Sequence, residues 1–155
     1  MLTDRGKFGM QVLILNLHYP PDTGATARII EDVAQALATR HRVTVLAGRP
    51  SYDPEERHPY YLLRRDRKGA VDVERVGSTA FDRRQMAGRI ANYLSYLTLS
   101  SVRALTRRPK PDIIIAMTDP PIVSLIGAVA AIVRRVPLVY NIRDLHPDMA
   151  ISAGI

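Results

Sequence analysis

The chain has 155 residues, 46% of them hydrophobic, and carries 22 Lys and Arg against 15 Asp and Glu, a formal net charge of +7. This length and composition suit one domain with a packed core and argue against an intrinsically disordered chain. Cysteine is absent and the apolar runs are short, so the sequence excludes disulfide and thiolate metal sites and predicts neither a secretory signal nor a membrane-spanning helix.

The first third of the chain predicts a strand, a helix and a second strand. Residues 1–9 are polar and are interpreted as a leader or disordered start, so the domain is expected to span residues 10–155. Met10–Leu15 is a nearly continuous apolar run, typical of a strand buried on both faces. Ala25–Ala38 has apolar residues at helical spacing, and Arg42–Ala47 forms the next short strand. Such a unit has parallel strands with the helix as crossover.

The middle of the chain is less regular. Pro50–Lys68 has no period and contains three prolines, which predicts a mobile surface excursion. Val71–Val76 alternates apolar and acidic residues, as in a strand exposed on one face. Met86–Thr106 predicts a helix that is stopped by the prolines after it. Its apolar stripe consists of Ile90, Tyr93, Leu94 and Leu97, widened by Tyr96, Leu99 and Val102.

The last third repeats the pattern of strand, helix and strand. Asp112–Met117 predicts a buried strand, and Ile122–Val133 a helix that is apolar nearly all round and should be deeply buried. Pro137–Ile142 predicts the last strand. Together the elements predict a doubly wound, mainly parallel α/β sheet. The chain stops where another helix should begin, so it is expected to be cut short, leaving a sheet edge and an apolar helix face exposed.

Three loops follow predicted strands and carry functional side chains: residues 18–24, 118–121 and 143–148. In an open parallel sheet, ligands bind beyond the carboxyl ends of the strands. The three loops should therefore meet on one rim.

The first of these loops ends in Gly24, immediately before a predicted helix. Free amides and partial positive charge at a helix N-terminus favour an anion, and a glycine lets a phosphate approach the backbone. Alternatively, Gly24 only makes the turn, with Asp22 or Thr23 as the helix cap. Neither the dinucleotide-binding nor the P-loop glycine pattern is present, which argues against those two classes of site.

The last loop, RDLHPD, brings together Arg143, Asp144, His146 and Asp148. A carboxylate and an imidazole at a strand end can move a proton or hold a hydroxyl-rich substrate. The alternative is a helix entry capped by Asp144 or Asp148, and the same plain capping role is the favoured interpretation of Asp119. A metal site would need more ligands than this loop offers, so none is expected.

The helix Met86–Thr106 lies in a strongly basic segment. Residues 83–110 contain seven basic residues and no acidic ones, whereas the rest of the chain is balanced, which predicts a local anionic partner. Three interpretations remain open: a helix lying on an anionic membrane, an ordinary core helix with a solvated basic face, and a nucleic-acid contact. No nucleic-acid-binding motif accompanies the segment, so nucleic acid is not the expected partner.

Four pieces in order, covering almost the whole chain, resemble a known family. They are HYPPDTGATARIIEDVAQALA, then RVTVLAGRPSY, then NYLSYLTL ahead of RPKPDIIIAMTDPP, and finally VPLVYNIRDLHPDMA. The sequence resembles the Rossmann-like N-terminal domain of two-domain GT-B glycosyltransferases of the GT4 group. It is most similar to members that build lipid-linked or capsular polysaccharides, the colanic-acid type.

The resemblance implies an acceptor-binding domain that is incomplete at its C-terminal end and lacks the donor-binding domain. The implied reaction transfers a sugar from a nucleotide-diphosphate donor to a lipid-linked or polysaccharide acceptor, with retention. It uses no tightly bound cofactor or metal, and the nucleotide sugar is a co-substrate. The 155 residues alone are expected to be inactive. The implied location is cytoplasmic, peripheral at the inner face of the membrane.

Site residues are implied in the same way. Gly24, flanked by Thr23 and Ala25, would face the donor phosphates, and Arg143 and Asp144 would be catalytic, facing the acceptor hydroxyl and the anomeric centre. Residues expected on the acceptor side are His18, Asp119 and His146. Residues expected to face an anionic membrane and its lipid-linked acceptor are Arg89, Tyr93, Tyr96, Arg103, Arg107 and Arg108.

The sequence departs from the family pattern at two positions. Many relatives carry two adjacent glycines where this chain has only Gly24, and many have a histidine where it has Arg143. Two rival functions remain open: a non-catalytic binding module or split transferase half that recruits a partner at the membrane, and a different Rossmann-like enzyme such as a reductase or epimerase. The second would need the missing glycine fingerprint.

Overall fold

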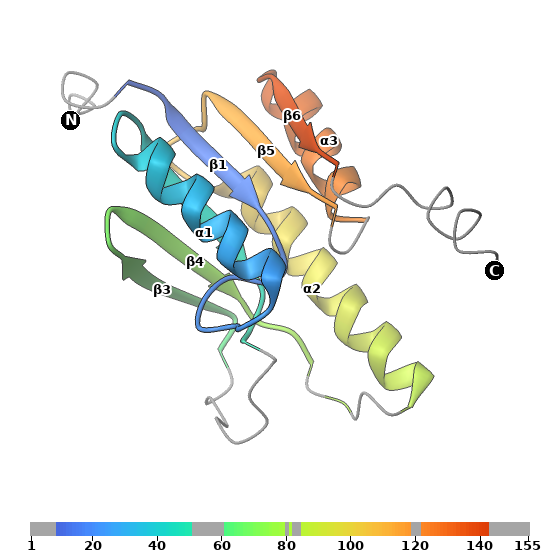
Figure 1. Cartoon of the computed structure of the whole chain (residues 1–155). Coiled ribbons are helices and arrows are strands. Elements are labelled where there is room, and N and C mark those ends of the chain that lie inside the picture. The colour runs from blue at the N-terminus through green and yellow to red at the C-terminus, as the bar shows by residue number, and fades with distance from the viewer. Residues whose placement is uncertain (1–8, 51–60, 80, 82–84, 119–121, 143–155) are drawn as a thin grey trace, which may run out of the picture.

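The computed structural model describes residues 9–50, 61–79, 81, 85–118 and 122–142, which form a six-stranded sheet flanked by three helices (Figure 1). The strands are β1 (Gln11–Leu15), β2 (Arg42–Ala47), β3 (Leu63–Lys68), β4 (Val71–Val76), β5 (Ile113–Met117) and β6 (Leu138–Asn141). The helices are α1 (Ala25–Ala38), α2 (Met86–Thr106) and α3 (Val123–Arg134).

The strand order is β3-β4-β2-β1-β5-β6, and every neighbouring pair is parallel except the antiparallel pair β3–β4. The chain therefore builds outward from β1 to β2 and β4, and then returns to the other side of β1 for β5 and β6. This reversal confirms the predicted doubly wound, mainly parallel α/β sheet. It also makes the junction between β1 and β5 the topological switch point.

Alternation along the strands separates the core into two layers. In β1, Val12 and Ile14 pack toward α1, whereas Leu13 and Leu15 pack toward α2 and α3. Figure 1 shows α1 over one face of the sheet and α2 and α3 over the other. Because each face of a parallel sheet needs such a cover, β1 is apolar at every inward position. Each fully buried aliphatic side chain contributes about 1.5–3 kcal/mol to folding.

The prediction of an irregular excursion over Pro50–Lys68 is wrong for its last six residues. Leu63–Lys68 forms β3, an edge strand with sequence LRRDRK that pairs with β4. Its side chains are mostly exposed, so no apolar alternation announces it. Ion pairs to acidic residues of neighbouring elements compensate its charge, including Lys68 Nζ to Glu31 Oε1 at 2.9 Å and Arg65 Nε to Glu74 Oε1 at 3.6 Å.

The strand predicted over Val71–Val76 is present, but it is not open on one face. Every residue of β4 except Asp72 is buried. Glu74 is covered by α2, where Arg103 donates two hydrogen bonds to its carboxylate, from Nε at 2.7 Å and from Nη2 at 2.6 Å. Arg75 is covered on the opposite face, with Nε 3.3 Å from Asp66 Oδ2. Alternation with charged residues therefore marks buried ion pairs in this strand, not a solvent face.

The helix predicted over Met86–Thr106 has the expected bounds, but only part of its apolar stripe faces the core: Tyr96, Leu97 and Leu99 pack there, whereas Ile90, Tyr93, Leu94 and Val102 are exposed. The buried residues of α2 recur at four-residue spacing, and all except Tyr96 are small or polar: Gly88, Asn92, Tyr96, Ser100 and Ala104. Ser100 donates to the carbonyl oxygen of Tyr96 at 2.6 Å, which satisfies its hydroxyl inside the helix. Ile90 is 50% exposed and Leu94 57% exposed. Short side chains at most of the buried positions allow α2 to lie close to the sheet, and several of its larger apolar residues remain outside.

The helix predicted to be deeply buried, α3, is buried on one side only. Its outer face is apolar and exposed, and consists of Leu125, Val129, Ile132 and Val133. The neighbouring edge strand β6 exposes Val139 and Tyr140. The expectation of full burial is therefore wrong, and the expectation of an exposed edge and apolar helix face is confirmed for the described residues.

Candidate functional site

The described candidate residues His18, Asp22 and Gly24 follow β1 at the carboxyl edge of the sheet. Residue 16 follows β1, and residue 118 follows β5, the two strands that meet at the switch point. The segment after β1 leads to α1 on one face of the sheet, and the segment after β5 leads to α3 on the other (Figure 1). Open α/β proteins bind ligands at such a switch point, beyond the carboxyl ends of the strands.

The segment after β1 places a histidine next to a buried carboxylate. His18 Nδ1 lies 3.2 Å from Asp22 Oδ2, and the two side chains are 13% and 1% exposed. The Asn16 side chain donates from Nδ2 to the carbonyl oxygen of His18, which holds the turn. An ionised carboxylate only accepts, so the pair puts the proton of a neutral imidazole on Nδ1 and makes Nε2 an acceptor.

The first turn of α1 follows this pair and has no side-chain cap. Gly24 is the N-cap residue, and neither Asp22 nor Thr23 caps the helix, so that expectation is wrong: the Asp22 carboxylate is engaged with His18. Gly24 has φ −63° and ψ 152°, an extended conformation open to any residue. The backbone angles therefore do not require a glycine. Thr23 and Ala25 are exposed, and the uncapped end carries the partial positive charge that favours an anion.

Two buried polar atoms in this segment have no hydrogen-bond partner: the side-chain oxygen Oδ1 of Asn16 and the hydroxyl of Tyr19. Both residues are fully buried. Burial raises the pKa of Tyr19 from 10.0 to about 12, with a smaller contribution from Glu31, while Arg75 acts in the opposite direction. Unpaired buried polar atoms are uncommon and cost free energy, so this segment is not optimised for stability alone.

A buried arginine of β4 also holds the same segment. Arg75 of β4 donates from Nη2 to the carbonyl oxygen of Pro20 and from Nη1 to that of Gly48 at 3.5 Å. It thereby joins the segments that follow β1 and β2. The peptide bond between Pro20 and Pro21 is cis. No role for Arg75 could be predicted from the sequence, because its contacts span 55 and 27 residues of chain.

On the α2 side, the rim contains a pocket of about 120 Å³ that the sequence did not predict. Its lining residues follow β1, β2 and β4 or belong to α2: Leu17, Arg49, Ser78, Arg89, Asn92, Tyr93 and Tyr96. Asn92 fixes its wall by donating to the carbonyl oxygen of Phe81 at 3.0 Å and accepting from the Phe81 amide at 3.0 Å and from the Thr79 hydroxyl at 2.8 Å. The available sequence signal was an asparagine on the sheet-facing side of α2.

Of the six residues expected to face a membrane, Tyr96 and Arg107 are buried and Arg103 is partly buried against Glu74, so this expectation is wrong for these three. Tyr96 is 2% exposed and packs against the sheet. Arg103 is bound to Glu74, and Arg107 donates to the Thr44 hydroxyl, with burial lowering its pKa. These arginines attach α2 to β4 and β2, because a buried carboxylate requires opposite charge around it. The remaining three are exposed: Arg89, Tyr93 and Arg108.

Several predicted site residues lie outside the described residues: Asp119, Arg143, Asp144, His146 and Asp148. Thr118, immediately after β5, is described and buried. Among the residues placed by the structure, no group of three or more His, Cys, Asp and Glu is arranged to hold a metal ion. Within the same residues, no helix has the length and apolar character needed to cross a lipid bilayer.

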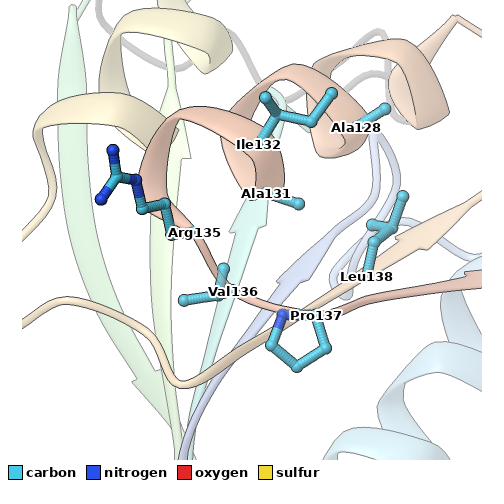
Figure 2. Close-up of a pocket in the computed structure, with 7 residues that line it drawn as sticks. All are labelled: Ala128, Ala131, Ile132, Arg135, Val136, Pro137 and Leu138. Carbon is cyan, nitrogen blue, oxygen red and sulfur yellow. The ribbon is translucent and has the colours of Figure 1, made fainter.

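A larger hollow, of about 570 Å³, lies far from this chemistry. Figure 2 shows its lining on α3 and on the turn into β6. The lining consists of Ala128, Ala131, Ile132, Arg135, Val136, Pro137 and Leu138. The turn is at the amino end of β6, opposite to the edge where parallel sheets bind ligands, and all but one of these residues are apolar. This hollow belongs to the exposed edge of the sheet and is not a candidate active site.

Comparison with known proteins agrees with this geometry. A family model described as a glycosyl transferase 4-like domain matches residues 24–154. No curated protein matches the chain significantly. The matched range begins at Gly24 and includes α1, β2 and all later elements, whereas β1 and the pair of His18 and Asp22 precede it.

Proposed function

The chain belongs to the glycosyl transferase 4-like domain family, and we propose that it is the acceptor-binding N-terminal domain of a GT-B glycosyltransferase. In this proposal the complete enzyme transfers a sugar, with retention, from a nucleotide-diphosphate donor to a lipid-linked or polysaccharide acceptor. The donor binds mainly to a second domain. The 155 residues alone are inactive, and the reaction needs no tightly bound cofactor.

The observation that carries the proposal is the construction of the rim after β1. An uncapped helix N-terminus at Gly24 lies six residues from His18, whose imidazole is held by the buried carboxylate of Asp22. The first feature suits a phosphate, and the second suits a hydroxyl group. A sugar transferase must bring together these two groups, the diphosphate of the donor and the hydroxyl of the acceptor.

His18 has a defined part in this proposal. With Nδ1 directed at Asp22, the imidazole accepts a hydrogen bond from the acceptor hydroxyl at Nε2 and fixes its direction of attack. Asp22 is a positioning residue that sets the tautomer. Gly24 admits the donor phosphate to the amides of α1, where its developing charge is stabilised. Arg143 and Asp144 are proposed to complete the site beside the acceptor hydroxyl and the anomeric centre.

The outer side of α2 is proposed to meet an anionic membrane. Its exposed apolar residues Met86, Ile90, Tyr93 and Leu94 recur at helical spacing, with Arg89 among them. A helix with an exposed apolar stripe and nearby cations can lie in the interface of an anionic bilayer. This arrangement would deliver a lipid-linked acceptor to the rim from the cytoplasmic side.

The experiment that tests the proposal is sugar transfer by the full-length gene product. The protein is incubated with radiolabelled UDP-glucose, UDP-galactose, GDP-mannose and GDP-fucose in turn, together with cell membranes, and label is counted in extracted lipid and polysaccharide. We expect transfer from one donor, none by the 155 residues alone, and a loss of about tenfold or more in His18→Ala. Thr39→Ala, an exposed change at the other end of α1, serves as the matched control.

Two results would contradict the proposal. Absence of transfer from every donor would favour a non-catalytic module that recruits a partner. Unchanged transfer in His18→Ala, with the variant shown to be folded by circular dichroism, would show that the His18 imidazole does not act on the acceptor. The assignment as a sugar transferase would stand.

A further inference from the structure

The edge strand β3, with sequence LRRDRK, gives the sheet a basic outer edge (Figure 1). The strands β4 and β2 separate it from β1 and the candidate site. We propose that β3 is a docking site for an extended acidic segment of a partner protein, which adds to the sheet as a further strand. The inference does not depend on the proposed sugar transfer, because it concerns a different part of the sheet.

The backbone of β3 can pair on its outer side. The Gly77 amide donates to the carbonyl oxygen of Leu62 at 2.9 Å, so these two residues form a hydrogen-bonded pair next to the antiparallel ladder of β3 and β4. Such pairs alternate along a ladder, and Leu63, Arg65 and Arg67 therefore direct their N–H and C=O groups away from β4. In the described part of the chain, no strand pairs with that side. An open edge of this kind is a template for strand addition.

The charge around β3 is positive even after its ion pairs are counted. Among the described residues, eight Lys and Arg side chains, four of them from β3, make ion pairs with only four carboxylates. An excess of four positive charges remains. Two cations of β3 have long contacts and exposed side chains: Arg65 Nε lies 3.6 Å from Glu74 Oε1, Arg67 Nε lies 4.0 Å from Asp72 Oδ1, and the arginines are 69% and 70% exposed. They can contact an added carboxylate without leaving their present positions.

The same charge determines the class of partner. A second copy of β3 would place four cations opposite four cations, and this repulsion is how basic edge strands avoid self-association. A strand with acidic residues would form cross-strand ion pairs in place of each repulsion. An anionic polymer without a peptide backbone would match the charge but leave the N–H and C=O groups of the edge unpaired. The occupant is therefore an acidic peptide segment.

The two sides of β3 differ and predict the sequence pattern of the partner. Arg65 and Arg67 lie on the side of α2, with no acidic residue of β3 between them on that side. Arg64 and Lys68 lie on the side of α1, and Asp66 stands between them. The α2 side therefore has more uncompensated charge, and Arg65 lines a hollow of about 280 Å³ there. An added strand should be acidic at every second residue, with these side chains on the α2 side.

The strand is held in place without a partner. Gln35 of α1 donates from Nε2 to the carbonyl oxygen of Lys68 at 2.7 Å, and Lys68 Nζ lies 2.9 Å from Glu31 Oε1. The hairpin from β3 to β4 turns at Gly69, whose φ of 59° is a left-handed conformation that favours glycine. A fixed edge lowers the entropic cost of docking, because only the incoming segment has to be ordered.

Fluorescence anisotropy with the full-length gene product tests the inference. The probe is a labelled peptide in which glutamate alternates with valine and threonine, and we expect saturable binding. The same peptide with lysine in place of glutamate should not bind. Arg65→Gln and Arg67→Gln should each weaken binding of the acidic peptide about fivefold, since each removes an exposed ion pair. Arg40→Gln, an exposed arginine just after α1, changes net charge equally and should have no effect.

Two methylated peptides test strand addition separately from charge. One has N-methyl groups on every glutamate amide and the other on every valine and threonine amide, so their charges are equal. The amides of successive residues in a strand point to opposite edges, so only one of the two sets can face β3. That peptide should fail to bind, and the other should bind as well as the unmethylated probe.

Four results would overturn the proposal. They are unchanged binding in both arginine variants, binding of both methylated peptides, binding of neither, and equally tight binding of a polyphosphate with the charge of the peptide. Failure of the acidic peptide itself to bind would leave the cations of β3 as a protection against self-pairing. Sugar transfer should be the same in Arg67→Gln as in the wild type, so loss of docking and loss of transfer are separate outcomes.

Discussion

Replacing Tyr19 by phenylalanine tests whether the Tyr19 hydroxyl, in the segment after β1, is buried away from water and lacks a hydrogen-bond partner. The Tyr19 side chain is fully buried and its hydroxyl has no hydrogen-bond partner. Leaving a buried hydroxyl unpaired costs about 1–3 kcal/mol. Tyr19→Phe removes this group without changing the shape of the ring, so the variant should be at least as stable as the wild type at neutral pH.

The effect should grow with pH, and its size follows from the raised pKa. Burial raises the pKa of Tyr19 to about 12 in the folded protein, against 10.0 for an ordinary solvated tyrosine, as in the unfolded chain. Between these values the unfolded chain has lost the proton and the folded protein has kept it, so stability falls as the pH rises through this window. At about pH 11 the loss is about 1.4 kcal/mol. Phenylalanine cannot ionise, so the advantage of the variant should widen by this amount.

The assay is urea denaturation followed by far-ultraviolet circular dichroism at about pH 8 and about pH 11. Other titrating groups are common to both proteins and cancel in the difference between them. Thr39→Ala, which alters an exposed hydroxyl, should differ from the wild type by the same amount at both pH values. A constant difference between Tyr19→Phe and the wild type would refute the buried, dry hydroxyl. Clear destabilisation at neutral pH would show that the hydroxyl has a partner.

Two further predictions concern packing and the membrane. A Cβ at Gly77 would lie 2.0 Å from a backbone carbonyl oxygen, whereas one at Gly48 would lie 2.5 Å from the end of a leucine side chain. Overpacking should therefore lower the free energy of unfolding by about 3 kcal/mol in Gly77→Ala and by about 1 kcal/mol in Gly48→Ala, as measured by urea denaturation. A larger loss in Gly48→Ala than in Gly77→Ala would contradict these contacts. Leu94→Glu should weaken sedimentation with vesicles containing anionic phosphatidylglycerol by about thirtyfold, from the loss of about 2 kcal/mol of burial. Ile29→Glu on α1 is its matched control, and equal effects in both variants would argue against α2 as the membrane contact.

The sequence singled out the segment after β1, although the contacts of its side chains could not be assigned. Gly24 was identified because it stands between an apolar strand and an amphipathic helix, and the structure has it there as the N-cap residue of α1. Asp22 was one of two residues that could have capped that helix; the N-cap residue is Gly24, and the Asp22 carboxylate contacts His18. Capping the helix and contacting His18 would each give the Asp22 carboxylate a partner within a few residues of chain. Local spacing does not distinguish them, because the choice depends on how the turn is held by Asn16 and Arg75.

The charged residues show the same dependence on tertiary contacts. Arg103 and Arg107 have the sequence context of a solvated basic helix end, yet both point to Glu74. The sequence could not reveal this arrangement, since Glu74 lies about 30 residues earlier and alternates with valines as a solvent-facing residue would. Burial of a carboxylate is favourable only when cations surround it, and the fold supplies them.

The sequence by itself determined the elements: α1, α2, β2 and β4 have the predicted bounds. The spacing of apolar residues and the length of apolar runs are properties of the chain alone. They therefore predict the helices, the strands and the doubly wound order. The tertiary structure alone decided which side of α2 faces the sheet and that LRRDRK is a strand. The apolar residues of α2 cover more than half of its circumference, so periodicity alone does not say which of them face the sheet; the structure buries the side with Gly88, Ser100 and Ala104 and leaves Ile90 and Leu94 exposed. An edge strand without apolar alternation exists only because β4 offers it hydrogen bonds.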